Sequence, residues 1–134
     1  MVPENIDDFE ELSRYIFQSG HYSTTKIKYS SLLPIYNKNN ERFETSVFRS
    51  SFINSNDEVW AIGDKFAGLD RERVQAKGIL IAKSVRKENL EVVPETSSHD
   101  LHADIIHWPA EKPDRILMAK KLVKHSSLEI REQP

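Results

Sequence analysis

VQAKGILIAKSV, residues 74–85, decides the fold together with KENLEVVP, residues 87–94. In the first segment the even positions are mostly apolar, and the odd positions include Ile79 and Ile81. Apolar residues on both faces are typical of a strand that is covered on both sides or lies in the middle of a sheet. Residues 87–89 have turn character and Pro94 ends the second segment. The sequence therefore predicts an antiparallel hairpin of strands 74–85 and 90–93.

Helices and short strands are predicted on either side of this hairpin. Residues 57–67 predict a helix with Ser55 in a capping box and Gly68 as its stop. A closing helix is predicted over residues 113–125, with Pro113 in its first turn. The N-terminal segment predicts a helix ended by Gly20, because five apolar residues recur at helical spacing: Ile6, Phe9, Leu12, Ile16 and Phe17.

Strands are expected near residues 27–29 and over residues 43–48 and 101–108, with a turn at 37–40. The order is helix, two strands, helix, hairpin, strand, helix. It predicts an α+β fold with a largely antiparallel sheet packed with about three helices. We expect one globular domain over residues 1–134, with a frayed tail at residues 129–134.

Composition excludes several classes of protein. The 134 residues contain no cysteine, which excludes disulfides, thiol nucleophiles, cysteine zinc sites and iron–sulfur clusters. The net charge of −2 argues against nucleic-acid binding through bulk positive charge. No window has the roughly 18 consecutive apolar residues of a membrane span, and the N-terminus lacks the apolar core of a signal peptide. These observations predict a cytoplasmic protein.

Three histidines in one short stretch raise the question of a metal site. His99, His102 and His107 cannot converge from a single strand, because His102 and His107 have opposite parity and point to opposite faces. His99 and His107 share a parity but lie about 26 Å apart at the rise of a strand. We therefore predict no metal site from these residues, and no motif indicates a cofactor.

His102 and Asp104 are the strongest candidates for catalysis. They lie two residues apart on one face of the predicted strand, so their backbones are roughly 7 Å apart. A histidine oriented by a carboxylate is an arrangement typical of a general base. In this hypothesis the chain is a small hydrolase or nuclease, and Arg49 contacts a substrate phosphate.

The closing helix offers a second candidate surface. Lys120, Lys121 and Lys124 form a basic stripe, which could bind nucleic acid or an acidic partner. No aromatic residue interleaves the stripe, as a base-stacking platform requires, so cations at the negative end of a helix dipole are the simpler interpretation. Trp108 precedes Pro109 at the predicted end of a strand, where it closes the core or lines a binding cleft.

The segment 102–109 also carries a resemblance. Its pattern His-Ala-x-Ile-x-x-Trp-Pro before a C-terminal helix resembles small uncharacterised bacterial proteins, and residues 46–50 are similar to an upstream segment of the same group. The resemblance implies a bacterial source and transfers no catalytic residues.

The absence of a complete catalytic constellation favours binding over catalysis. We expect a small cytoplasmic accessory or interaction module that binds a protein partner. The hydrolase and the nucleic-acid binder are the alternatives, and the sequence leaves the oligomeric state open.

Overall fold

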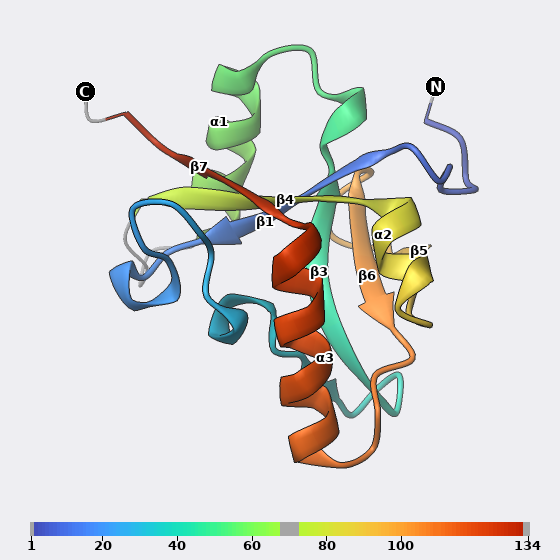
Figure 1. Cartoon of the computed structure of the whole chain (residues 1–134). Helices are drawn as coiled ribbons and strands as arrows, with labels where there is room; N and C mark the ends of the chain where they lie inside the picture. Colours follow the sequence, from blue (N-terminus) through green and yellow to red (C-terminus); the bar gives the residue numbers. More distant parts are fainter. Residues whose placement is uncertain (1, 68–72, 133–134) are drawn as a thin grey trace.

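The computed structural model describes residues 2–67 and 73–132 and has the predicted α+β class (Figure 1). The described part contains a seven-stranded sheet whose pairings are all antiparallel. The strands are β1 (Glu11–Ile16), β2 (Ile35–Asn37), β3 (Arg42–Arg49), β4 (Ala76–Ile81), β5 (Glu91–Pro94), β6 (His102–Ile106) and β7 (Ser127–Ile130). The helices are α1 (Asn56–Ala67), α2 (Ala82–Lys87) and α3 (Lys112–His125), with short 3-10 turns η1 (Ser19–His21), η2 (Tyr29–Leu32) and η3 (Ser50–Phe52).

The strands lie in the order β5-β6-β3-β1-β4-β7, and β2 pairs only with the first residues of β3 among the described strands. The predicted hairpin of strands 74–85 and 90–93 is therefore wrong. Strand β4 ends at Ile81, and helix α2 carries the chain to β5 at one edge of the sheet. Ala82 and Val85 are both fully buried, and their spacing of three residues places them on one side of a helix.

The predicted N-terminal helix is also wrong, because residues 11–16 form a central strand. Strand β1 pairs with β3 on one side and with β4 on the other. Leu12 and Ile16 are buried, and their spacing of four residues suits one face of a helix and one face of a strand equally. Phe9, which the helix would have buried, is 75% exposed.

Two smaller predictions also need correction. Residues 127–130 form β7 on the outer side of β4 rather than part of a frayed tail, and Pro134 lies outside the described residues. Near residues 27–29 the chain forms only an isolated bridge and the turn η2.

The elements with strong local signals are confirmed. Helix α1 begins where the Ser55 hydroxyl accepts the backbone N–H of Glu58 at 3.2 Å. Helix α3 has proline in its first turn and buries Ala119 and Leu122. Strand β3 and the turn before it are present as predicted, while Gly68 lies outside the described residues.

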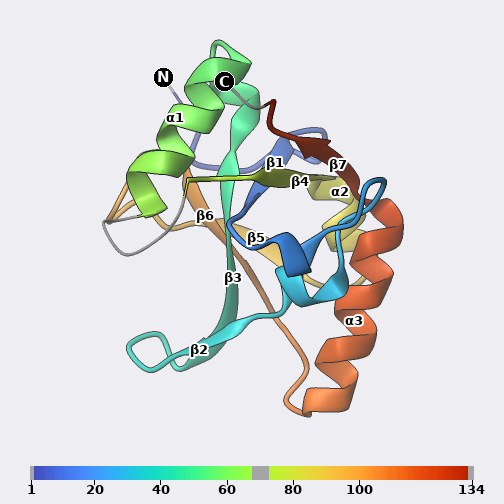
Figure 2. The ribbon, with the colours of Figure 1, turned by 90° about the vertical axis from the view of Figure 1, so that its left-hand side faces the viewer.

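Helices lie on both faces of the sheet (Figure 2), and each face carries a hydrophobic core. On one face α2 and α3 cover Leu12, Ile16 and Leu80, whereas on the other α1 packs against Tyr15 and Phe48. Helix α1 lies at the end of the sheet away from β2, so it does not cover the β2 end of this second face (Figure 2). None of the helices in the described ranges combines the length and apolar content that crossing a membrane requires.

Candidate functional site

Strand β6 places the predicted pair on the sheet face that α1 covers only in part. His102 lies opposite Phe48 and Asp104 opposite Ser46 in the register with β3. Because side chains alternate along a strand, Ile105 points to the other face. It is completely buried there, as predicted. His102 and Asp104 therefore share one face, with Ser46 exposed beside them.

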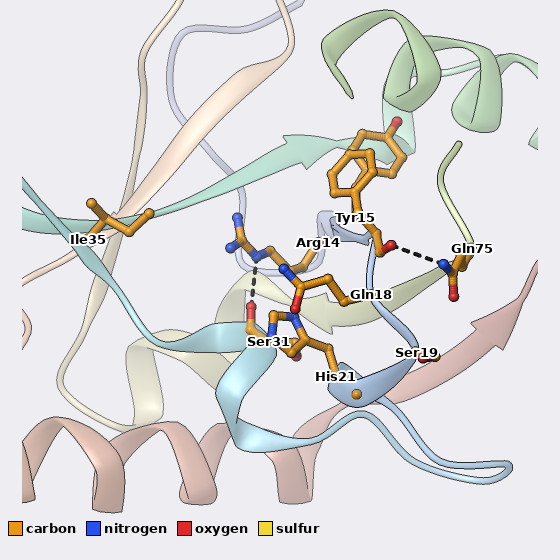
Figure 3. A pocket seen from close by; sticks show the side chains of 10 residues that line it. Arg14, Tyr15, Gln18, Ser19, His21, Ser31, Ile35 and Gln75 are labelled. Carbon is orange, nitrogen blue, oxygen red and sulfur yellow. Dashed lines mark hydrogen bonds between the residues drawn. The ribbon is translucent and has the colours of Figure 1, made fainter. Parts of the chain in front are cut away.

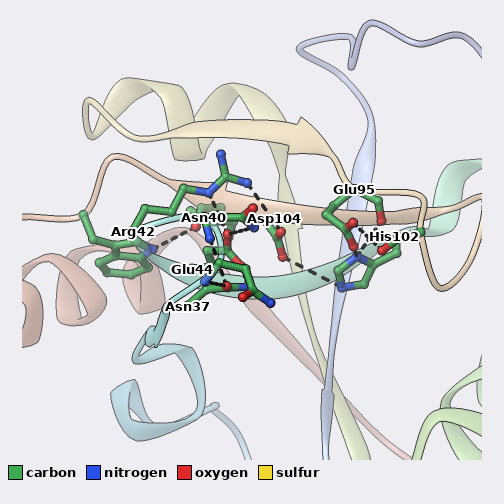
Figure 4. A network of polar contacts seen from close by, with 11 residues as sticks. Asn37, Asn40, Arg42, Glu44, Glu95, His102 and Asp104 are labelled. Atoms are coloured by element: carbon green, nitrogen blue, oxygen red, sulfur yellow. Dashed lines mark hydrogen bonds and ion pairs between the residues drawn. The ribbon is translucent and has the colours of Figure 1, made fainter.

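Glu95 and Asp104 lie on either side of the His102 ring (Figure 4). Its Nδ1 is 2.8 Å from the backbone oxygen of Glu95 and 3.2 Å from the Oε2 atom of the same residue. Its Nε2 faces Asp104 Oδ1 at 3.8 Å. The Phe48 ring meets the imidazole edge-on at 5.4 Å between centroids, which limits its rotation.

The carboxyl of Asp104 is the most unusual group at this site. Its side chain is 2% exposed, and Oδ1 has no hydrogen-bond partner among the described residues. The other oxygen lies 3.7 Å from Arg42 Nη2. Burial raises the pKa of Asp104 to about 6, although the nearby His102 opposes the shift. The group is an acid that titrates close to neutral pH.

A second carboxylate lies next to Asp104 on β3. Glu44 accepts hydrogen bonds from Arg42 at 2.6 Å, Asn40 at 2.7 Å and Asn37 at 3.1 Å. Burial alone raises its pKa, but these three donors outweigh burial and leave the pKa of Glu44 below its ordinary value. One face therefore holds an ionised carboxylate and a carboxyl of raised pKa.

Arg49 does not join this site. It precedes η3 and points to the opposite face of β3, where its side chain is 2% exposed. Its Nε and Nη2 donate to the two carboxylate oxygens of Glu10 at 2.7 and 2.9 Å, and Nη1 donates to the backbone oxygen of Pro3 at 2.6 Å. The guanidinium is fully engaged in a structural ion pair, so it is not placed to hold a substrate at His102.

The rings of the other two histidines make different contacts. His107 follows the end of β6 with a φ of 73° and is exposed. The ring of His99 packs edge-on against Phe48 and Phe66, and its Nδ1 accepts the backbone N–H of Leu101 at 3.0 Å.

Sequence reasoning missed Glu95, Glu44 and Arg42. Arg42 and Glu44 alternate on β3 in the same way as His102 and Asp104 on β6. That signal becomes visible only once the two strands are known to pair.

The basic stripe on α3 acquires aromatic neighbours from other elements. Lys120 lies 5.1 Å from the centre of the Tyr29 ring, and Arg115 lies 3.8 Å from that of Phe43. Lys121 and Lys124 are exposed on the same helix. Trp108 is 8% exposed and donates from Nε1 to the backbone oxygen of Ile105 at 3.0 Å, so it belongs to the core and not to a binding surface.

Two cavities share Arg14 and Ile35 in their linings, and one of them borders the site. One of about 670 Å³ is lined by Arg14, His21 and Gln75 among others, and Arg14 Nε donates to the backbone oxygen of Ser31 at 2.8 Å (Figure 3). Burial, assisted by Arg14, lowers the pKa of His21 there. A second cavity of about 420 Å³ lies along β2, and Glu44 connects it to the polar network.

No family model, curated protein or solved structure matches this chain. The resemblance of residues 102–109 therefore stays an expectation, and the geometry of the site carries the functional argument.

Proposed function

We propose that this chain is a small cytoplasmic accessory module that binds a protein partner through the hairpin arm, which we define as residues 35–44. The arm comprises β2, the turn after it and the start of β3, and it projects from the sheet away from α1 (Figure 2). The observation that supports the proposal is the exposure of two large side chains on this arm. Ile35 is 73% exposed and Tyr36 is 49% exposed.

The two side chains offer contact area on both faces of a short edge strand. Ile35 lies opposite Glu44 in the pairing, whereas Tyr36 points to the other face and packs against Phe43 at 5.1 Å. Phe43 in turn lies under Arg115 of α3. Tyrosine and arginine are the residue types enriched at the energetic centres of protein interfaces. The outer edge of β2 is unpaired within the described ranges, so an extended partner segment can add to it as a further strand.

Charge indicates the chemistry of the partner. Arg115 of α3 contacts Phe43 of the arm, and the exposed lysines 120, 121 and 124 follow it on the same helix. This positive charge favours a segment rich in acidic and apolar residues. A single-stranded nucleic acid is the competing ligand, because Tyr29 and Phe43 supply the rings that the stripe itself lacks. The exposed aliphatic Ile35 and the net charge of −2 favour the protein partner.

Photo-cross-linking in cells tests the proposal. A photoreactive phenylalanine analogue is placed at Tyr36, and in a matched control at Phe9, which is 75% exposed on the loop before β1. We expect a protein adduct at position 36 and not at position 9. With that protein purified, Tyr36→Ser should weaken binding at least tenfold, and Phe9→Ser should leave it within twofold. Adducts with nucleic acid alone, or equal adducts at both positions, would overturn the proposal.

A hydrolase is the second candidate, and one observation favours it. His102 Nε2 and Asp104 Oδ1 face each other at 3.8 Å beside exposed Ser46. Two observations oppose it, since Arg49 points to the opposite face and the Asp104 carboxyl is shielded from solvent. Hydrolysis of a phosphodiester by the wild type, lost in His102→Ala, would establish this function in place of the binding module.

A further inference from the structure

We propose that Glu95, His102 and Asp104 form a binding site for one divalent transition-metal ion, with Zn²⁺ as the best fit. One potential ligand atom from each residue lies within 4.8 Å of the other two. The three ligand residues lie outside the hairpin arm, although Arg42 of the arm lies 3.7 Å from Asp104. The metal titration uses no partner protein, so the inference does not depend on the partner proposal.

The imidazole is already oriented as a metal ligand. Its Nδ1 lies 2.8 Å from the backbone oxygen of Glu95, which can only accept a hydrogen bond, so the ring proton resides on Nδ1. Nε2 is then an acceptor directed at Asp104. Metal-bound histidines commonly donate their second ring N–H to a backbone carbonyl in this way.

Asp104 provides the observation that points to a cation. Its Oδ1 is buried without a hydrogen-bond partner in the described part of the chain, and it faces Nε2 at 3.8 Å. Two acceptors that face each other at this distance leave both lone pairs unsatisfied, which is costly for buried groups. Two metal–ligand bonds of about 2.1 Å span up to about 4.2 Å, so one ion fits between these atoms.

Glu95 supplies the third ligand from outside β6. It follows Pro94 at the end of β5, and its side chain is 30% exposed, so the carboxylate can adjust. Ser97 donates to Oε1, and Oε2 lies 3.2 Å from Nδ1 of His102. The Glu95 carboxylate must therefore turn past the edge of the ring to reach an ion bound at Nε2. Arg42 lies at 3.7 Å from Asp104 Oδ2, the oxygen that points away from the ion.

The donor set selects the metal. One imidazole and two carboxylates suit Zn²⁺ or Mn²⁺ better than Mg²⁺ or Ca²⁺, which prefer oxygen ligands alone. Three protein ligands leave a coordination position for water, and two carboxylates balance the charge of the ion. The parity argument that separates His102 from His107 stands, because the ligands here are carboxylates that β6 and the loop after β5 bring to His102.

Calorimetric titration of the chelator-stripped protein with Zn²⁺, Mn²⁺ and Mg²⁺ tests this site. We expect one Zn²⁺ per chain, weaker Mn²⁺ binding and no measurable Mg²⁺ binding. Glu95→Gln, His102→Ala and Asp104→Asn should each weaken Zn²⁺ binding at least tenfold. His125→Ala is the matched control, because His125 lies 3.5 Å from Glu88 in a more exposed histidine–carboxylate pair that has no third candidate ligand within residues 2–67 and 73–132.

The thermal melting temperature separates loss of the site from loss of the fold. Zn²⁺ should raise it in the wild type and in His125→Ala. It should not do so in Glu95→Gln, whose side chain is 30% exposed and whose fold should persist. The absence of Zn²⁺ binding would overturn the inference. Binding that survives all three ligand substitutions, or that is lost in His125→Ala, would do the same. The partner proposal is unaffected by any of these results.

Discussion

Strands β3 and β6 separate two buried charged sites that differ in how well their polar atoms are satisfied. On one face, Arg49 and Glu10 form a bidentate ion pair, and the guanidinium also donates to the backbone oxygen of Pro3. On the other, one buried oxygen of Asp104 has no hydrogen-bond donor among the described residues, and it faces His102 Nε2, which is an acceptor in the neutral ring. The side chains of Arg49 and Asp104 are each 2% exposed.

This difference separates structural charge from charge that is available for chemistry. A buried ion pair whose donors and acceptors are matched holds elements together and leaves no unpaired donor or acceptor for a ligand. A buried carboxyl left unsatisfied costs folding free energy, and it retains the capacity to bind a proton or a cation. Arg49 and Asp104, which the sequence suggested as partners in one catalytic site, belong to these two different classes.

The largest loss of stability is expected at the buried ion pair of Arg49 and Glu10. Arg49→Met should lower the free energy of unfolding by about 3–5 kcal/mol, because it leaves the Glu10 carboxylate buried without its partner. Chemical denaturation measures this loss. The double variant Glu10→Gln with Arg49→Met should recover much of it, and equal losses in the single and double variants would contradict the ion-pair account.

The next largest loss of stability is expected in the core on the opposite side of β6 from Asp104. Ile105→Ala should cost about 2–5 kcal/mol through lost burial and the resulting cavity, since the side chain is completely enclosed. Denaturation under the same conditions gives the value. A loss below about 1 kcal/mol would mean that the inner face of β6 is packed less tightly than its burial indicates.

Substitution of the unsatisfied carboxyl, that of Asp104, should stabilise the protein, in contrast to the two substitutions above. In the chelator-treated protein, Asp104→Asn should raise the free energy of unfolding at pH 7 by about 1–3 kcal/mol, since each unit of pKa shift corresponds to about 1.4 kcal/mol. Because the folded-state pKa of Asp104 is raised to about 6, the wild type loses stability as pH rises from about 4 to 6. The gain from the substitution should therefore vanish below about pH 4. Denaturation from pH 3.5 to 8 measures it, and a gain independent of pH would contradict the assignment.

His102→Ala should change the free energy of unfolding less than Ile105→Ala or Asp104→Asn. We expect a loss of about 1 kcal/mol or less in the metal-free protein, because the histidine contributes one hydrogen bond and one ring contact at the edge of the core. Its effect on Zn²⁺ affinity should be much larger. If His102→Ala unfolds the domain as severely as Ile105→Ala, the residue is part of the core and not of a site.

The hairpin arm should show the smallest effect on folding. Tyr36→Ser should change the free energy of unfolding by no more than about 0.5 kcal/mol, because the ring is half exposed. Its influence should appear in partner binding instead. A loss of several kcal/mol would show that the contact between Tyr36 and Phe43 holds the arm in place.

The sequence determined the elements whose signals are local. The Ser55 cap and the proline in the first turn of α3 each favour the start of a helix, and the alternation in β3 and β6 favours a strand. The same alternation placed Ile105 inside the core and His102 beside Asp104. These properties follow from the spacing of side chains within one segment, so no partner strand is needed to predict them.

Only the tertiary structure decided the rest. The spacing of Leu12 and Ile16 fits a helix and a strand equally, and the pairing of β1 with strands on both sides settles the choice. Strand pairing also brings Arg42 and Glu44 beside Asp104 and sends Arg49 to the opposite face. Which residues of distant segments share a face depends on the register between strands. Long-range hydrogen bonds and packing fix that register, and the pattern within any single segment does not encode it.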